Sequence, residues 1–256
     1  PQENKSFYSQ LVTVGIPVLM QQLIAVGLNL ADTIMVGKVS SNALAAVGAA
    51  NQVYFVYSVI LFGIFSGAAV YTVQYWGVKD LASLRKILGI DYVMWLALTI
   101  PVVLLAFFAS PVLMGLFTDD PEVIALGGDY MHIACFSYIF SGFTFSVTYN
   151  SRAIIRLKVP TAINCVAILI NITLNYCLIY GNFGMPDLGV KGAAIATLIA
   201  RVIEAAAMFI YVYFSKDHPL AAKPREFLSF GKDMYKSVIR TAVPVMFNEG
   251  CWALSV

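Results

Sequence analysis

Long uninterrupted runs of apolar residues dominate the chain. They extend over about Phe7 to Val36, Leu44 to Trp76, Ile87 to Phe117, Val123 to Tyr149, Pro160 to Tyr180, Val190 to Phe214 and Val238 to Val256. Each reaches or nearly reaches the ~20 residues that a helix needs to cross ~30 Å of hydrocarbon. The runs are continuous and do not alternate with polar residues, which excludes strands. The pattern therefore predicts an all-α integral membrane protein, with a six-helix transmembrane bundle followed by a seventh helix.

The positive charges lie in alternate loops between these runs. One set of loops holds Lys5, Lys79, Arg85, Lys86, Arg152, Arg156, Lys158, Lys216, Lys223, Arg225, Lys232, Lys236 and Arg240, whereas the other set holds only Lys38 and Lys191. Loops rich in Lys and Arg stay on the cytoplasmic side of a membrane. We therefore expect a multi-pass protein of the cell (plasma or inner) membrane with a cytoplasmic N-terminus.

The composition excludes several functional classes. Hydrophobic residues make up 60% of the chain, charged residues 12%, and the mean hydropathy is +0.80. The net charge of +2 gives no reason to expect a nucleic-acid partner. The cysteines lie in apolar runs without metal-binding spacing, and no Ser or Cys is paired with a base. We expect neither an enzyme with catalytic residues nor a bound cofactor.

The domain organisation follows from the single long polar linker. Residues 1–214 are predicted to form an N-terminal lobe, 215–236 a cytoplasmic linker, and 237–256 the start of a second lobe. The segment VGIPVLMQQL at 14–23 resembles TAVPVMFNEG at 241–250, which supports a two-lobe repeat. Chance similarity between apolar segments is the alternative. No signal peptide is visible, and the chain stops inside an apolar run, so we expect it to be cut short, without its C-terminal lobe.

Asp32 is the first candidate functional residue. A carboxylate inside the bilayer is costly unless it faces water or a partner, so such acids are functional candidates. Asn29 precedes Asp32 by three residues and therefore lies on the same helical face. The alternative is an acid at the helix end that contacts interfacial water.

A second group of polar residues lies at a similar depth. Asn164, Asn171 and Asn175 share one face of the fifth run, where hydrogen bonds between helices are the alternative explanation. From a rise of ~1.5 Å per residue, Asp32 lies about 6 Å, Asn175 about 8 Å, Asn171 about 14 Å and Thr197 about 10 Å from the outer ends of their runs. The first, fifth and sixth spans are therefore predicted to form one polar pocket.

Other charged residues receive different interpretations. Glu249 lies about 16 Å into the seventh run, near the membrane midplane. Arg201 and Glu204, three residues apart, are interpreted as a structural ion pair in preference to a functional one. Asp91 and Asp129 lie close to the ends of their runs and are predicted to be interfacial.

Local motifs predict turns and close helix packing. Asp120 is predicted to cap a helix that begins at Pro121. The segments GIFSG at 63–67 and GAAIAT at 192–197 present small residues that let helices approach closely.

The sequence resembles the multidrug and toxic compound extrusion (MATE) family. The similarity lies in four segments. They are the stretch at 17–37, which begins with Pro, contains Gln and ends in ADTIMVG, then NITLNYCLIYG at 171–181, LGVKGAAIAT at 188–197 and PVMFNEGCW at 244–252. The resemblance implies half of a twelve-helix, two-lobe transporter. It also implies export of cationic or amphipathic organic compounds in exchange for Na⁺ or H⁺ by alternating access.

The resemblance also implies roles for individual residues. Asp32 matches the acid that binds the coupling cation, and Asn171 and Thr197 match further positions of that site, so Na⁺ is expected at these three residues. Ala193 matches a position that contributes a backbone carbonyl, and Asn175 stands where many members have a second aspartate. Glu249 matches a proposed cation site in the seventh helix.

Two other functions remain open at this point. A lipid-linked oligosaccharide flippase of the same superfamily would have a similar fold, but it generally needs a cationic cleft. Arg201 is the only Lys or Arg assigned to the spans, since Lys191 and Arg240 stand at run ends and are counted with the loops. A channel is the other alternative, although single buried acids fit alternating access better.

Overall fold

The computed structural model describes residues 15–16, 19, 27, 30–215, 218–221, 224–227 and 230–255. Within these ranges the regular elements are helical and there is no strand, which confirms the all-α prediction. Most of the first predicted span lies outside the described residues, but its last part, residues 30–37, is helical.

The remaining elements follow in order along the chain. They are α2 (Ser41–Gly77), α3 (Leu81–Phe108), α4 (Ser110–Met114), α5 (Pro121–Ala153), α6 (Lys158–Tyr180), a short 3-10 helix (Asn182–Gly184), α7 (Gly189–Phe214), α8 (Pro224–Phe227) and α9 (Lys232–Ser255). Among the described residues, five helices are long and apolar enough to cross a membrane: α2, α3, α5, α6 and α7.

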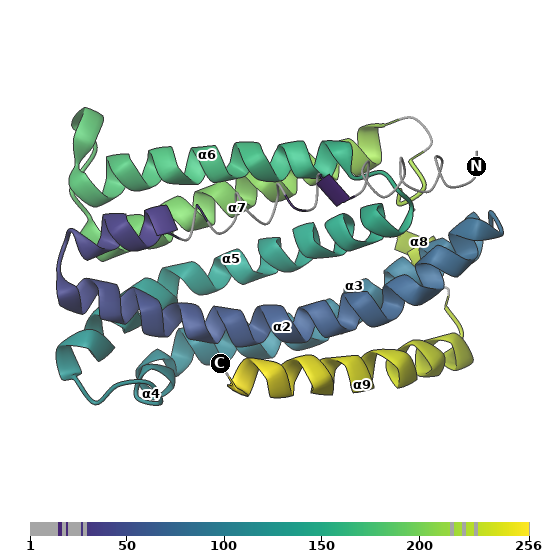
Figure 1. Ribbon diagram of the computed structural model, residues 1–256, viewed down its shortest axis with the longest axis horizontal. Helices are drawn as coiled ribbons and strands as arrows, with labels where there is room; N and C mark the ends of the chain where they lie inside the picture. The colour runs from purple at the N-terminus through teal and green to yellow at the C-terminus, as the bar shows by residue number, and fades with distance from the viewer. Residues whose placement is uncertain are drawn as a thin grey trace, which may run out of the picture.

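The long helices run back and forth along one direction (Figure 1). The connections at 38–40, 109–120 and 181–188 lie at one end of the bundle, and those at 78–80 and 154–157 lie with α8 at the other end. This alternation agrees with the predicted order of spans. The Lys-rich and Arg-rich loops therefore share one end of the molecule, while the orientation in a membrane stays a prediction.

The third apolar run is divided differently from the prediction. Its helix α3 begins at Leu81, capped by the Asp80 side chain, and ends at Phe108. A short helix, α4, then begins at Ser110 with Pro111 in its first turn. The break lies at Ala109, whose backbone angles (φ −120°, ψ 25°) are not helical. Pro111 lies in the first turn of α4, where its missing N–H group is tolerated.

The earlier start of α3 changes the environment of Asp91. This residue lies well inside α3, and none of its surface is exposed. Asp91 is therefore enclosed by protein, because the helix begins at Leu81 and not near Ile87. Its position at the membrane interface stays a prediction. Asp129 is half-exposed and forms an ion pair with Lys191 across 3.1 Å.

Local capping fixes the ends of α5 and α6. The Asp120 carboxylate accepts hydrogen bonds from the backbone N–H groups of Glu122 and Val123 at 2.9 and 3.4 Å, with Pro121 as the first helical residue. This confirms the predicted cap. Gly181 ends α6 with a φ of 66°, a left-handed conformation in which glycine is not strained.

Small residues bring pairs of helices into close contact. Gly63 and Gly67 of α2 lie directly against Met246 and Ala242 of α9, where an added Cβ would meet the backbone of these residues. Gly192 of α7 lies against the backbone of α6 in the same way. The predicted close packing at both segments is confirmed.

The segment between α7 and α9 packs onto the bundle. His218 and Leu220 are buried, and the backbone of Phe227 in α8 lies against Gly89 of α3. Arg85 of α3 forms an ion pair with Glu226 of α8 at 3.2 Å. Because α9 already begins at Lys232, the predicted linker overlaps its first turn. The division into two lobes stays a prediction.

Candidate functional site

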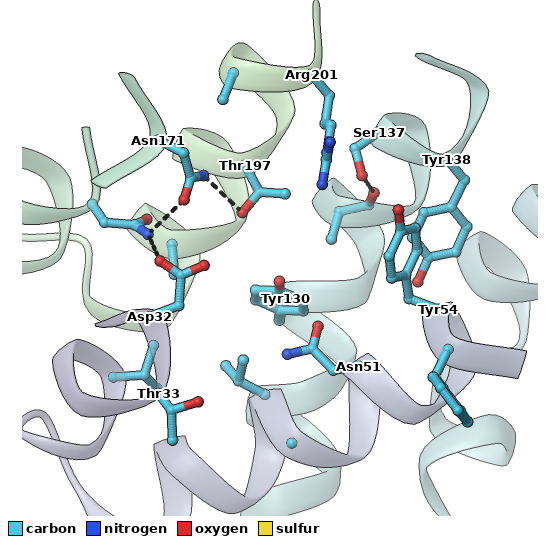
Figure 2. Close-up of a pocket in the computed structure, with 18 of the residues that line it drawn as sticks. Asp32, Thr33, Asn51, Tyr54, Tyr130, Ser137, Tyr138, Asn171, Thr197 and Arg201 are labelled. Carbon is cyan, nitrogen blue, oxygen red and sulfur yellow. Dashed lines mark hydrogen bonds between the residues drawn. The ribbon is translucent and has the colours of Figure 1, made fainter. Parts of the chain in front are cut away.

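A cavity of about 560 Å³ lies between the helical segment 30–37 and helices α2, α5, α6 and α7. Its polar and aromatic lining residues are Asp32, Thr33, Asn51, Gln52, Tyr54, Phe55, Ser58, Tyr130, Ser137, Tyr138, Asn171, Asn175, Thr197, Arg201 and Glu204. Ala193 also contributes to the wall. Polar groups from these elements converge on this space, as Figure 2 shows for the labelled residues.

A chain of hydrogen bonds connects Asp32 to α6 and α7 (Figure 2). Asn175 Nδ2 donates to Asp32 Oδ1 at 2.5 Å and to Asn171 Oδ1 at 3.2 Å. Asn171 Nδ2 in turn donates to Thr197 Oγ1 at 3.4 Å. The two amides are 5% exposed or less, and Asn175 Oδ1 is buried without a hydrogen-bond partner among the described residues. Asp32 and Thr197 at the two ends of this chain are partly exposed and line the cavity.

Local sequence explains why these groups meet. Asn171 and Asn175 are four residues apart and therefore lie on one face of α6. Gly192 lets α7 approach that helix closely enough to bring Thr197 opposite Asn171. The hydroxyl of Tyr180 donates to the backbone carbonyl of Met35 at 2.7 Å, which ties the helical segment 30–37 to α6.

Arg201 and Glu204 form the predicted ion pair, with Nη1 and Oε2 separated by 2.7 Å. Both residues also line the cavity, and Figure 2 shows the Arg201 side chain pointing toward the same space as Asp32. A purely structural interpretation of the pair is therefore too narrow. Since this pair balances itself, the Asp32 carboxylate is the remaining charge of the described cavity lining when it is ionised.

Tyrosines form a second wall of the cavity. The rings of Tyr54 and Tyr138 lie 5.2 Å apart, and those of Tyr57 and Tyr138 stack at 5.3 Å. Tyr57 also hydrogen-bonds to Thr99 Oγ1 at 2.8 Å and to the carbonyl of Tyr138 at 2.9 Å, which links α2, α3 and α5. Tyr54 is therefore the partly exposed ring of this wall, and the buried rings of Tyr138 and Tyr57 support it.

The lining residues fit a small hard cation. Asp32, Asn171 and Thr197 offer oxygen atoms, which are the ligands that such cations prefer. The buried Oδ1 of Asn175 is a further acceptor without a donor among the described residues. The donor set is therefore compatible with Na⁺ or with a proton on the carboxylate.

Other predicted site residues lie elsewhere. Asn29 is outside the described residues. Glu249 lies on α9 and is absent from the described lining of the cavity, although it is close enough to Tyr149 to act on it electrostatically. Asn164, on the same helix as Asn171, is likewise not part of this lining.

Sequence reasoning missed the contributions of α2 and α5. The pair Asn51 and Gln52 interrupts an otherwise apolar run, and this interruption could have identified α2 as part of the pocket. On α5, Tyr130, Ser137 and Tyr138 recur at helical spacing among small residues. A polar stripe of this kind indicates a face turned toward protein or water.

Comparison with known proteins assigns the chain to a family. The MatE family model matches residues 17–177, which is more than half of the chain. The chain belongs to the MatE family. This establishes the family resemblance and, with the five apolar helices, a multi-pass membrane protein.

Individual MatE relatives and structures agree with this assignment. The chain is 35% identical over 210 residues to the "probable multidrug resistance protein NorM" of Rhizobium meliloti (strain 1021), covering 78% of this chain and 42% of the relative. It is 26% identical over 236 residues to the "probable multidrug resistance protein YoeA" of Bacillus subtilis (strain 168), covering 91% and 50%. The chain thus spans about half the length of these curated relatives.

Two solved structures share the fold. One is described as the outward-facing conformation of a multidrug resistance MATE family transporter, with a TM-score of 0.83, 20% identity, and coverage of 94% of this chain and 52% of that one. The other is the inward-facing conformation, with a TM-score of 0.80, 20% identity, and coverage of 96% and 55%. At this identity the similarity supports the fold alone.

Proposed function

We propose that this chain is the N-terminal lobe, with the first helix of the C-terminal lobe, of a secondary antiporter. The complete protein exports cationic or amphipathic organic compounds in exchange for Na⁺ or H⁺ by alternating access. The observation that carries this proposal is the buried hydrogen-bonded chain from Asp32 through Asn175 and Asn171 to Thr197 at the edge of a large cavity.

Asp32 is the residue that binds the coupling cation in this mechanism. The ionised carboxylate attracts a cation. Binding of Na⁺, or protonation of the carboxylate, neutralises the charge that Asn175 faces. The hydrogen bonds between residues 30–37, α6 and α7 then rearrange, and the shape of the cavity changes with them. Coupling requires only that the cation bind the two conformations with different affinities.

The charge of the cavity favours cationic substrates over phosphate-bearing lipids. Its described lining contains two acids, Asp32 and Glu204, and one base, Arg201, which Glu204 already neutralises. A flippase for a lipid-linked oligosaccharide would need an excess of positive charge to bind a phosphate. The ring of Tyr54, supported by the buried ring of Tyr138, instead offers an aromatic surface to a substrate.

The experiment is dye efflux from cells that express the complete protein, with Na⁺ and pH varied independently. Wild type is compared with Asp32→Asn and with Asp187→Asn, an exposed acid in the turn between α6 and α7. Asp32→Asn keeps the volume of the side chain and an oxygen that can accept from Asn175, but removes the charge.

We expect gradient-driven efflux in wild type and in Asp187→Asn, and its loss in Asp32→Asn. The ion whose gradient drives wild-type efflux is the coupling ion. Efflux at the wild-type rate in Asp32→Asn would refute the role of this residue. Absence of efflux from all three proteins at equal expression would shift the assignment to the flippase.

A further inference from the structure

A completely buried acid lies away from the cavity, in the half of the bundle that contains the Lys-rich and Arg-rich loops. Asp91 of α3 is completely buried, together with Thr72 of α2 and Asn150 of α5. Asn150 Nδ2 donates to Asp91 Oδ2 at 2.9 Å, and the hydroxyl of Thr72 donates to Asn150 Oδ1 at 2.9 Å. These three residues connect three helices in one polar cluster, which is absent from the described lining of the cavity.

The orientation of the Asn150 amide is fixed by its other partners. Nδ2 also donates to the backbone carbonyl of Ser146 at 3.0 Å, and a carbonyl can only accept. The same nitrogen must therefore face Asp91 as a donor. The second carboxyl oxygen, Asp91 Oδ1, is buried without a hydrogen-bond partner among the described residues.

No cation balances Asp91 within the described part of the chain. Arg152, two residues from Asn150, lies over the ring of Tyr149, and Arg85, earlier on α3, pairs with Glu226. Two tyrosines are further polar neighbours: Tyr75 of α2 packs beside α3, and Tyr92 follows Asp91 directly on α3. None of these side chains forms an ion pair with Asp91.

An ionised carboxylate with one neutral donor and no cation is strongly disfavoured in a protein interior, and more so inside a bilayer. A neutral carboxylic acid leaves only one hydroxyl without an acceptor, which is a smaller penalty. We propose that Asp91 is a proton-binding site, with the proton on Oδ1 and with Oδ2 accepting from Asn150. This site is separate from the Asp32 cavity and does not depend on the proposed export function.

The position of the site links its occupancy to helix packing. Because Thr72, Asp91 and Asn150 come from three different helices, water reaches the carboxyl group only when α2, α3 and α5 separate. The proton therefore exchanges when this end of the bundle opens and is retained while it is closed.

The test is infrared spectroscopy of the purified complete protein in lipid at neutral pH. A protonated carboxyl group gives a C=O stretching band that is distinct from the carboxylate bands and shifts when H₂O is replaced by D₂O. We expect this band in wild type and in Asp187→Asn, in which an exposed acid is removed. We expect Asp91→Asn to lose one such band.

A spectrum of Asp91→Asn with the same protonated carboxyl bands as wild type would overturn the proposal, since Asp91 would then be ionised. If Asp91→Asn does not fold, Thr72→Val decides the question. This variant keeps the carboxyl group but removes the hydroxyl that orients Asn150, so the Asp91 band should shift in frequency. An unchanged set of carboxyl bands in Thr72→Val would also overturn the proposal.

Discussion

The close contact between α6 and α7 leads to a quantitative prediction for Gly192→Ala. A Cβ at this position would overlap the backbone carbonyl of Leu178 and come close to the backbone nitrogen of Ile179. The Leu178 carbonyl also accepts a hydrogen bond from the N–H of Leu188 at 3.0 Å, which closes the turn between the two helices. The added methyl group therefore pushes against backbone that cannot rotate away.

The expected cost follows from the geometry. Non-bonded carbon atoms prefer separations of about 3.5–4.0 Å, so α6 and α7 must move apart by on the order of 1 Å. Such overpacking costs about 1–3 kcal/mol. The Asn171–Thr197 hydrogen bond, already 3.4 Å long, should be lost first. We therefore expect reduced stability together with weaker binding of the coupling cation.

Thermal unfolding of the purified complete protein tests this prediction against Gly77→Ala. Gly77 ends α2, and a Cβ added there would have no atom within 4 Å, so both variants gain similar helix propensity and only Gly192→Ala meets a clash. Globular domains of 150–250 residues lose roughly 2–4 °C in Tm per kcal/mol, which sets the order of magnitude of the expected decrease. A Tm for Gly192→Ala equal to that of Gly77→Ala would refute the reasoning.

Two further predictions concern the ends of the bundle. Asp120→Ala should lower stability by about 1 kcal/mol because it removes the cap of α5, whereas its exposed neighbour Asp119→Ala should have little effect; chemical denaturation of both variants measures the difference. Burial lowers the pKa of His218 from its ordinary 6.5 to about 4, so the unfolded chain binds this proton more readily. Stability should therefore fall as the pH decreases from 6.5 toward 4, by at most about 1.4 kcal/mol per pH unit. The decrease should be smaller in His218→Gln. Melting curves at several pH values measure it, and an equal dependence of stability on pH in wild type and His218→Gln would contradict the prediction.

The extent to which the fold could be predicted depended on the length of each apolar run. Continuous runs identified α2, α5, α6 and α7 because a buried or lipid-facing helix needs no polar face. They placed the limits of α3 wrongly, since apolar residues continue past Phe108 and polar ones precede Ile87. Ser110 and Pro111 carried the signal for the break, but hydrophobicity alone does not detect it. The same error hid the burial of Asp91.

The candidate site could be predicted in part for a similar reason. Asp32, Asn171, Asn175 and Thr197 share one depth, and depth can be counted along a helix. Which faces of neighbouring helices meet depends on packing angles that the sequence does not specify. The wall that contains Tyr54 therefore became visible only in three dimensions.

The most direct test of the proposed mechanism is binding of the coupling cation to the purified complete protein. Isothermal titration calorimetry measures Na⁺ binding, and potentiometric titration measures proton binding, in wild type and in Asp32→Asn. Hydrogen bonds to a charged group contribute about 1.5–3 kcal/mol, so removal of the charge should weaken cation binding by at least about tenfold. Binding of the cation to Asp32→Asn with wild-type affinity would contradict the assignment of Asp32 as the coupling acid.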